Sequence, residues 1–330
     1  MFEELIPDLY RIEIPLPRSP LKALNAYLIK GHERSLLIDT GMNRKACLDP
    51  MRSCLKQLDV DLKRTDFFIT HLHADHLGLV QKLATDTSIV YFSRTEATLF
   101  NSIVNRVEKR QHAFFKLLYS HGFPEDELKK ALEGHPGYRY SSKSTIDFTE
   151  LTGGDIIRAG DYALTCIETP GHSPGHMCLY EKNKKLLFSG DHILSDITPN
   201  ITSWPDFSNT LKAFLESLDK VYALDVDLLL PGHRSLNTDH RKRIRELKEH
   251  HRDRLNEALA TVEEADRSAW EVAPHIAWDI RAESWEAFPS VQKWFAMGET
   301  IAHLNYLEAE GKIRKIEENG MIRFTAVSTE

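Results

Sequence analysis

An α/β layered domain followed by a small helical module is the fold class that the sequence predicts. Short apolar segments typical of strands alternate with amphipathic segments typical of helices along most of the 330 residues. This alternation indicates helices packed on sheets. Hydrophobic residues make up 42% of the chain and charged residues 28%, as in ordinary globular proteins. No stretch approaches the roughly 18 to 20 apolar residues of a membrane span.

Residues 1–237 are predicted to form the main domain, because strands and helices alternate through this part. A helical insertion at 94–150 interrupts it, and its aromatic, basic helices end at the breaker Gly134-His-Pro-Gly. The predicted strands lie within 8–41 and near 67–70, 88–92, 155–157, 163–167, 177–180, 185–188 and 227–230. The other predicted helices of this domain cover 45–59, 78–84 and 208–222.

A charged helix at 238–264 is predicted to connect the main domain to a separate module at 265–330. Helices near 268–275 and 291–310 precede two short strands joined by Asn319-Gly320, a pair that favours a tight hairpin turn. Helices followed by a two-stranded wing indicate a small winged-helix-like module. The basic run in the connecting helix is interrupted by acids, so a solvated helix face is favoured over an RNA-binding patch.

Four side chains that can bind metal crowd into six positions directly after a predicted strand: His71, His73, Asp75 and His76. Alternate residues of an extended segment point the same way, so His71 and His73 can converge on one ion. Once the chain turns, Asp75 and His76 can face a second ion beside it. Imidazole and carboxylate groups suit zinc, with iron and manganese as alternatives.

Three more candidate ligands follow glycine-containing turns at strand ends, in Thr169-Pro-Gly-His172, Ser189-Gly-Asp191 and Pro231-Gly-His233. Glycine lets the backbone turn sharply and approach closely. Each motif alone is weak, and ordinary loop histidines are the alternative. The repeated placement at strand ends favours a shared metal centre. The histidines that lack such a context, among them His250, His251 and His303, are assigned to surface or core.

The segment Thr-His-Leu-His-Ala-Asp-His at 70–76 matches the HxHxDH signature of the metallo-β-lactamase superfamily, which the chain resembles over about residues 8–236. The resemblance implies a four-layer αββα sandwich with two metal ions at one edge of the sheets. The ligands it implies are His71, His73 and His172 for the first ion, Asp75, His76 and His233 for the second, and Asp191 bridging both. It also implies that Asp39 orients the metal-binding loop without binding metal itself, and we assign His176 a similar supporting role.

Three further features narrow the resemblance to particular members of the superfamily. Thr-Pro-Gly-His-Ser-Pro-Gly-His at 169–176 is most similar to glyoxalase II and the related hydroxyacylglutathione hydrolases. Asp191 stands where many zinc β-lactamases have cysteine, which argues against antibiotic hydrolysis. The C-terminal part, including 295–307, instead resembles the winged-helix module of lactamase-β-like proteins, one branch of which cleaves single-stranded RNA.

The implied activity is hydrolysis by a hydroxide that bridges two divalent metal ions, which lower the pKa of a shared water. Asp75 would hold this hydroxide and take up its proton. A thioester is the first expected substrate, followed by other ester-like bonds. The alternatives are a single-strand-specific endoribonuclease and a metal-site protein with a non-hydrolytic role. Tyr119, Tyr138 and Tyr140 of the insertion are candidate substrate contacts, with packing in the core as the competing interpretation.

Charge sets the expected partners. The chain carries a net charge of -7, which disfavours nucleic acid and anionic membranes as general partners. Residues 261–330 hold seven basic and thirteen acidic side chains, so this module is expected to bind no duplex DNA. It is expected instead to brace the fold, to cover one side of the active-site cleft or to form a homodimer. An acidic N-terminus and four cysteines without a CxxC pair favour a cytoplasmic protein. The expected partner is a small-molecule substrate.

Overall fold

The computed structural model describes residues 1–280 and 282–327 and divides the chain into two compact units. The first comprises Met1–Arg106, Tyr140–Pro199 and Ser217–Arg243. The second comprises Val107–Arg139, Asn200–Glu216 and Ile244–Glu330. Neither unit is continuous in sequence, and the predicted insertion 94–150 is divided between them. None of the described helices is both long and apolar enough to cross a membrane.

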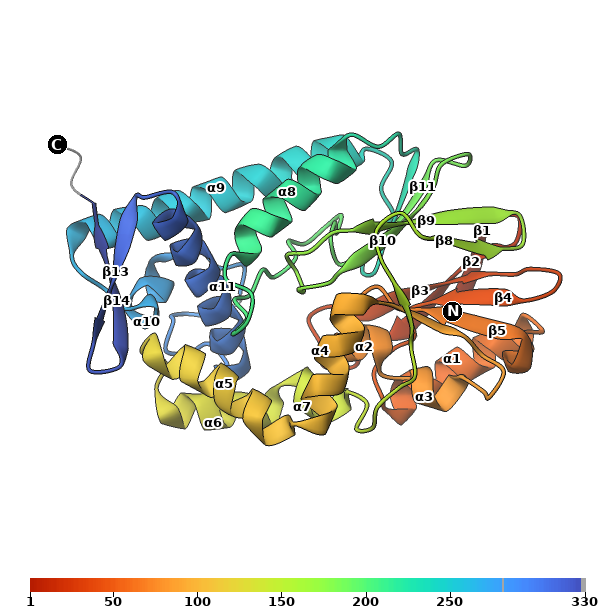
Figure 1. Ribbon diagram of the computed structural model, residues 1–330, viewed down its shortest axis with the longest axis horizontal. Helices are drawn as coiled ribbons and strands as arrows, with labels where there is room; N and C mark the ends of the chain where they lie inside the picture. Colours follow the sequence, from red (N-terminus) through yellow and green to blue (C-terminus); the bar gives the residue numbers. More distant parts are fainter. Residues whose placement is uncertain (281, 328–330) are drawn as a thin grey trace. The chain divides into compact units, whose positions relative to one another are not determined.

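The first unit contains a seven-stranded sheet in the order β1-β2-β3-β4-β5-β6-β7. Neighbouring strands are antiparallel from β1 to β4 and parallel from β4 to β7. The strands are β1 (Phe2–Ile6), β2 (Leu9–Pro15), β3 (Ala23–Ile29), β4 (Ser35–Ile38), β5 (Thr65–Phe68), β6 (Val90–Ser93) and β7 (Thr149–Leu151). β1 and β7 lie outside the predicted strands. Figure 1 shows β2 to β5 running side by side.

A five-stranded sheet, in the order β12-β11-β10-β9-β8, forms the second layer of strands. Its strands are β8 (Ile156–Ala159), β9 (Tyr162–Glu168), β10 (Met177–Glu181), β11 (Leu186–Gly190) and β12 (Leu228–Pro231). β11 and β12 are parallel, and the other pairs are antiparallel. One apolar cluster contains inward-facing residues of both sheets; for example, the rings of Tyr27 and Phe188 lie 5.4 Å apart between centroids. The two sheets therefore pack face to face as a sandwich.

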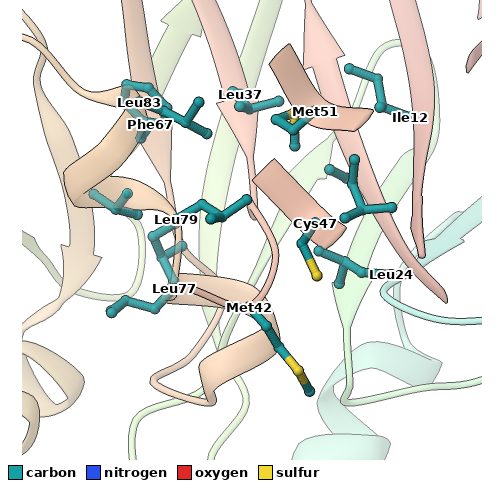
Figure 2. Packing of buried hydrophobic residues seen from close by; sticks show 14 of the residues in the cluster. Ile12, Leu24, Leu37, Met42, Cys47, Met51, Phe67, Leu77, Leu79 and Leu83 are labelled. Carbon is teal, nitrogen blue, oxygen red and sulfur yellow. The ribbon is translucent and has the colours of Figure 1, made fainter. Parts of the chain in front are cut away.

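The other face of the seven-stranded sheet is covered by helices. In α1 (Lys45–Gln57), the buried residues Cys47, Met51, Cys54 and Leu55 recur at helical spacing and face the sheet. Figure 2 shows this layer, in which side chains of α1 lie against Ile12, Leu24 and Leu37 of the strands. The remaining helical elements of this unit are η1 (Leu62–Arg64), α2 (Ala74–Leu77), α3 (Val80–Leu83), α4 (Arg94–Asn105) and the C-terminal part of α8 (Thr210–Tyr222). The predicted αββα metallo-β-lactamase architecture is confirmed.

The predicted helix at 78–84 starts earlier and is broken into α2 and α3. α2 begins at Ala74, with His73 as its N-terminal cap residue. The break falls at Gly78, where a Cβ atom would lie 2.4 Å from the carbonyl oxygen of Ala74 and 2.6 Å from the amide nitrogen of Asn43. Another chain segment thus approaches closer here than any side chain permits. The early start of α2 turns the chain between His73 and Asp75.

The second unit is mainly helical around its own apolar core. Its elements are α5 (Val107–Ser120), α6 (Glu125–Gly134), most of α9 (His240–Glu264), α10 (Ala269–Val272), η2 (Ala273–His275), α11 (Ser290–Ala309), β13 (Ile313–Glu318) and β14 (Met321–Ala326). The short α7 (Pro136–Tyr140) lies at the boundary between the units. Asn319 and Gly320 have φ values of 52° and 78° and join β13 to β14, as predicted for a type I′ hairpin turn.

Candidate metal centre

The seven predicted ligands belong to loops or short helices that follow strands, and the structure brings all seven together. Residues 71–76 follow β5, whereas His172, Asp191 and His233 follow β9, β11 and β12. Both sheets therefore contribute side chains at one edge of the sandwich. The glycine in Pro231-Gly-His233 is required by packing, because a Cβ on Gly232 would lie 2.6 Å from Oδ1 of Asp191.

Three imidazoles form the first group. Nε2 of His71 lies 2.9 Å from Nδ1 of His73, and Nε2 of His172 lies 3.0 Å from the same atom. A neutral imidazole nitrogen either donates or accepts a hydrogen bond. Nδ1 of His73 therefore cannot donate to both neighbouring Nε2 atoms with a single proton. Nitrogen atoms about 3 Å apart are instead what a common ion with bonds of about 2 Å to each would produce. The geometry of this group suits a metal ion.

Asp75, His76 and His233 form the second group. Nε2 of His233 lies 3.3 Å from Oδ2 of Asp75. The Nε2 atoms of His76 and His233 are buried and make no hydrogen bond among the described residues. Buried nitrogen atoms without a partner are rare and costly. Their presence here is the observation that best fits a bound cation.

Asp191 lies between the two groups. Its Oδ1 is 3.5 Å from Nε2 of His76, and its Oδ2 is 3.5 Å from Nε2 of His233 and 3.6 Å from Nε2 of His172. Oδ1 is buried and makes no hydrogen bond among the described residues. This position, within reach of histidines from both groups, allows one carboxylate to contact two ions.

A chain of hydrogen bonds around Asp39 orients two of the histidines. Oδ2 of Asp39 accepts from Nδ1–H of His76 at 2.7 Å and from the hydroxyl of Thr70 at 2.9 Å. The Thr70 oxygen in turn lies 3.0 Å from Nδ1 of His71 and accepts its proton. Both histidines consequently donate from Nδ1 and direct Nε2 into the centre. Nδ1 of His233 donates to the carbonyl oxygen of Ala23 at 2.7 Å, with the same result.

His176 also lies at the centre, but its two nitrogen atoms have other partners. Nδ1 is 2.8 Å from the hydroxyl oxygen of Thr169, and Nε2 accepts from the backbone N–H of Asp191 at 3.2 Å. With Nε2 accepting, Nδ1 carries the proton. His176 thus holds the backbone at Asp191, and its own lone pair is used for that purpose.

The charges of the site differ between its two groups. Burial, together with the neighbouring imidazoles, holds the pKa of His71 well below its usual range. Burial by itself would lower the pKa of His233, but the carboxylates of Asp191 and Asp75 outweigh burial and raise this pKa to about 10. The pKa of Asp75 is lowered to about 2, because His76 and His233 overcome the opposing effect of burial. The carboxylates of the second group therefore attract positive charge, whether a proton or a metal ion supplies it.

The sequence analysis missed Glu96, a fully buried carboxylate on α4 that joins two loops of the centre. It accepts hydrogen bonds from the amide of Leu72 at 2.8 Å, the hydroxyl of Ser173 at 2.8 Å and the amide of Gly175 at 2.7 Å. These loops carry the three imidazoles of the first group. In the sequence, Ser93-Arg-Thr-Glu96 has the spacing of a helix-capping box. Ser93 does accept from the amide of Glu96, but the Glu96 side chain points to the loops instead.

The three candidate substrate tyrosines occupy different surroundings. Tyr140, in the first unit, lies under the guanidinium of Arg44, 5.0 Å from the ring centroid. In the second unit, Tyr138 packs against the apolar core, and Tyr119 is 57% exposed. Their role in substrate binding remains a prediction.

Comparison with known proteins defines the family. Residues 21–233 match the model of the "Metallo-beta-lactamase superfamily". The chain belongs to this superfamily. Residues 255–327 match a second model, "Metallo-beta-lactamase-like, C-terminal domain". A divalent-metal hydrolase is thus indicated by the family and by the His/Asp cluster together.

Similar proteins within the superfamily cover the chain to different extents. The "Probable metallo-hydrolase YqjP" of Bacillus subtilis is 25% identical over 96% of this chain and 97% of its own length. The human "Acyl-coenzyme A thioesterase MBLAC2" is 26% identical over 63% of this chain and 72% of its own. A metallo-beta-lactamase family protein from Thermus thermophilus has a similar solved structure, with a TM-score of 0.84, 28% identity, and coverage of 98% of this chain and 100% of its own.

Proposed function

We propose that this protein is a thioesterase that uses two divalent metal ions, with zinc as the first expectation. The observation that carries the proposal is the convergence of seven side chains in which the buried atoms Nε2 of His76, Nε2 of His233 and Oδ1 of Asp191 lack hydrogen bonds among the described residues. The name of the acyl-coenzyme A thioesterase relative supports a thioester as the bond cleaved. A glyoxalase II-like substrate, a hydroxyacyl thioester of glutathione, is a narrower form of the same proposal.

The two proposed sites differ in their ligands. His71, His73 and His172 would hold one ion through neutral imidazoles. Asp75, His76 and His233 would hold the other, with Asp191 in contact with both. Bound ions would supply an activated water near neutral pH and polarise the carbonyl of the thioester. No protein nucleophile is required for this reaction.

The remaining chemistry belongs to the side chains of the chain itself. Asp75 is ionised and is placed beside His233, so its carboxylate can accept a hydrogen bond from the attacking water and take up its proton. Asp39 holds the imidazoles of His71 and His76 in one tautomer through Thr70 and directly. This arrangement is set before the substrate binds, so that little reorganisation is needed during the reaction.

The proposal is tested by substrate comparison on one purified, zinc-loaded sample. The panel contains an acyl-coenzyme A, a hydroxyacylglutathione, the oxygen ester matched to the acyl-coenzyme A, a lactone and single-stranded RNA. We expect release of free thiol from one or both thioesters at a higher kcat/KM than for the oxygen ester. Cleavage of RNA without thiol release would contradict the proposal and favour the ribonuclease alternative. No turnover of any substrate by a fully metal-loaded sample would favour a non-hydrolytic role.

A further inference from the structure

A second group of buried histidines lies in the second compact unit, on α9 and α11. His251 and His303 are fully buried, and Glu299 is 3% exposed. Nδ1 of His251 lies 3.1 Å from Nε2 of His303, and Nδ1 of His303 lies 2.8 Å from the backbone carbonyl oxygen of Glu299. These contacts join the two helices through polar atoms in an otherwise apolar interior.

The positions of the protons follow from these contacts. A carbonyl oxygen can only accept, so Nδ1 of His303 carries a proton and its Nε2 has a lone pair. His251 must then donate from Nδ1 to that lone pair. Nε2 of His251 is left with a lone pair of its own, is buried, and has no hydrogen-bond partner among the described residues.

Two further residues that can bind a metal ion lie beside His251. His250, His251 and Glu299 each place one ligand atom within 4.8 Å of those of the other two. A histidine that binds a metal ion usually donates the N–H of its other ring nitrogen to an acceptor. His251 has this arrangement, because its Nδ1 donates to His303 and its Nε2 has no hydrogen-bond partner among the described residues. We propose that His250, His251 and Glu299 form a second metal site, separate from the seven-residue centre, for a divalent transition-metal ion.

The ligand set defines the ion class and its position. Two imidazoles and one carboxylate suit zinc and its neighbours and leave coordination positions for water. His250 and His251 are consecutive on α9, and Glu299 belongs to α11, so the ion would cross-link these helices. His250 is half-buried, whereas His251 and Glu299 are buried.

The affinity of this site is limited by Arg254. Its guanidinium forms an ion pair with Oε1 of Glu299, and Asn200 donates to Oε2 at 2.7 Å. Each carboxylate oxygen keeps a second lone pair for a metal ion, but Arg254 already balances the negative charge. The seven-residue centre holds two carboxylates close to its histidines. The second site is therefore expected to fill after that centre and to lose its ion first to a chelator.

The proposal is tested by zinc content. The full chain is stripped of metal with a chelator, incubated with a graded excess of zinc alone, separated from free zinc and analysed for zinc per chain. His250→Gln and His251→Gln are each expected to bind one equivalent fewer than the wild type at saturation. The loss should appear in the weaker phase of the titration. His121→Gln is the matched control: His121 is also a buried histidine of this unit, and its Nδ1 donates to the carbonyl oxygen of Leu117.

The outcomes separate this site from the hydrolase proposal. Equal zinc content in the wild type and in both variants, each folded by circular dichroism, would show that the histidines form only a buried polar network. If His251→Gln fails to fold, the half-buried His250→Gln decides the question. The zinc count depends on no substrate, so it remains decisive even if no thioester is turned over. Where turnover is found, His250→Gln should retain it, since the residue lies outside the seven-residue centre.

Discussion

The carboxylate of Asp39 receives the Nδ1–H of His76 across 2.7 Å inside the sandwich. The same oxygen accepts from Thr70, and through it Asp39 also acts on His71. One buried carboxylate therefore fixes a histidine of each proposed metal site. This role was expected for Asp39 from the resemblance, and the hydrogen bonds now give it a physical form.

Asp39→Asn should lower metal affinity by about 10- to 100-fold. The asparagine amide has one acceptor oxygen for three donors, which are the backbone N–H of Thr70, the hydroxyl of Thr70 and the Nδ1–H of His76. At least one histidine should therefore lose its orientation. Competition with a chelator gives the affinity. Asp66→Asn is the matched control, since Asp66 is a buried carboxylate of β5 that pairs with Arg34. An affinity as high as that of the control would contradict the role of Asp39.

Unlike Asp39→Asn, Asp75→Asn should retain much of the metal but have reduced turnover. Removal of a general base typically costs about 10²- to 10⁴-fold in rate. An asparagine still offers an oxygen ligand but cannot take up the proton of water. Thioester turnover and elemental analysis on the same sample provide the test. Undiminished kcat would remove Asp75 from the proposed mechanism.

Glu96→Gln should destabilise the protein by about 1–3 kcal/mol. Glu96 accepts three hydrogen bonds, and the NH2 group of a glutamine would face at least one of these three donors in a buried site. The loops that carry His73 and His172 would loosen, and turnover should fall with stability. Urea unfolding and thioester assays measure the two effects. Glu150→Gln, at a 47% exposed side chain that pairs with Arg94, is the control and should change neither quantity appreciably.

His121 makes stability depend on pH in a defined direction. Burial lowers its pKa to about 4, whereas an unfolded histidine titrates near about 6.5. Between these values the unfolded chain binds the proton and the folded chain does not, so stability falls as the pH decreases from about 6.5 to 4. Between pH 7 and 5 the loss should be roughly 2 kcal/mol. Urea unfolding at both pH values should show a loss that is roughly 2 kcal/mol larger in the wild type than in His121→Gln; equal losses in the two proteins would contradict the prediction.

We predict that the C-terminal module binds no duplex DNA, although its helices and hairpin follow the order of a winged helix. Binding to phosphates needs unpaired positive charge. Three of its basic side chains are instead paired with acids: Lys315 with Glu308 at 2.8 Å, Arg323 with Glu271 at 3.1 Å and Lys293 with Glu127 at 3.1 Å. A fluorescence titration of the full chain with a labelled duplex at physiological salt provides the measurement. Micromolar binding that weakens as salt increases would overturn this prediction.

Local patterns predicted the strand ends and the convergence of the seven residues, because each ligand follows a strand and glycines mark several of the turns. The missed features depend on partners distant in sequence. Glu96 has the spacing of a capping residue, yet its acceptors serve amides at 72 and 175. The pairing of His251 with His303 likewise exists only once α9 and α11 pack. β7 has three residues and owes its existence to pairing with β6.

The seven residues of the centre stand at the ends of strands, and the long segment from 94 to 150 contributes none of them. The reacting groups are therefore held by the two sheets and by the loops and short helices that follow their strands. Insertions, deletions or substitutions in the connecting segments can change which molecule is admitted while the sheets keep the reacting groups in place.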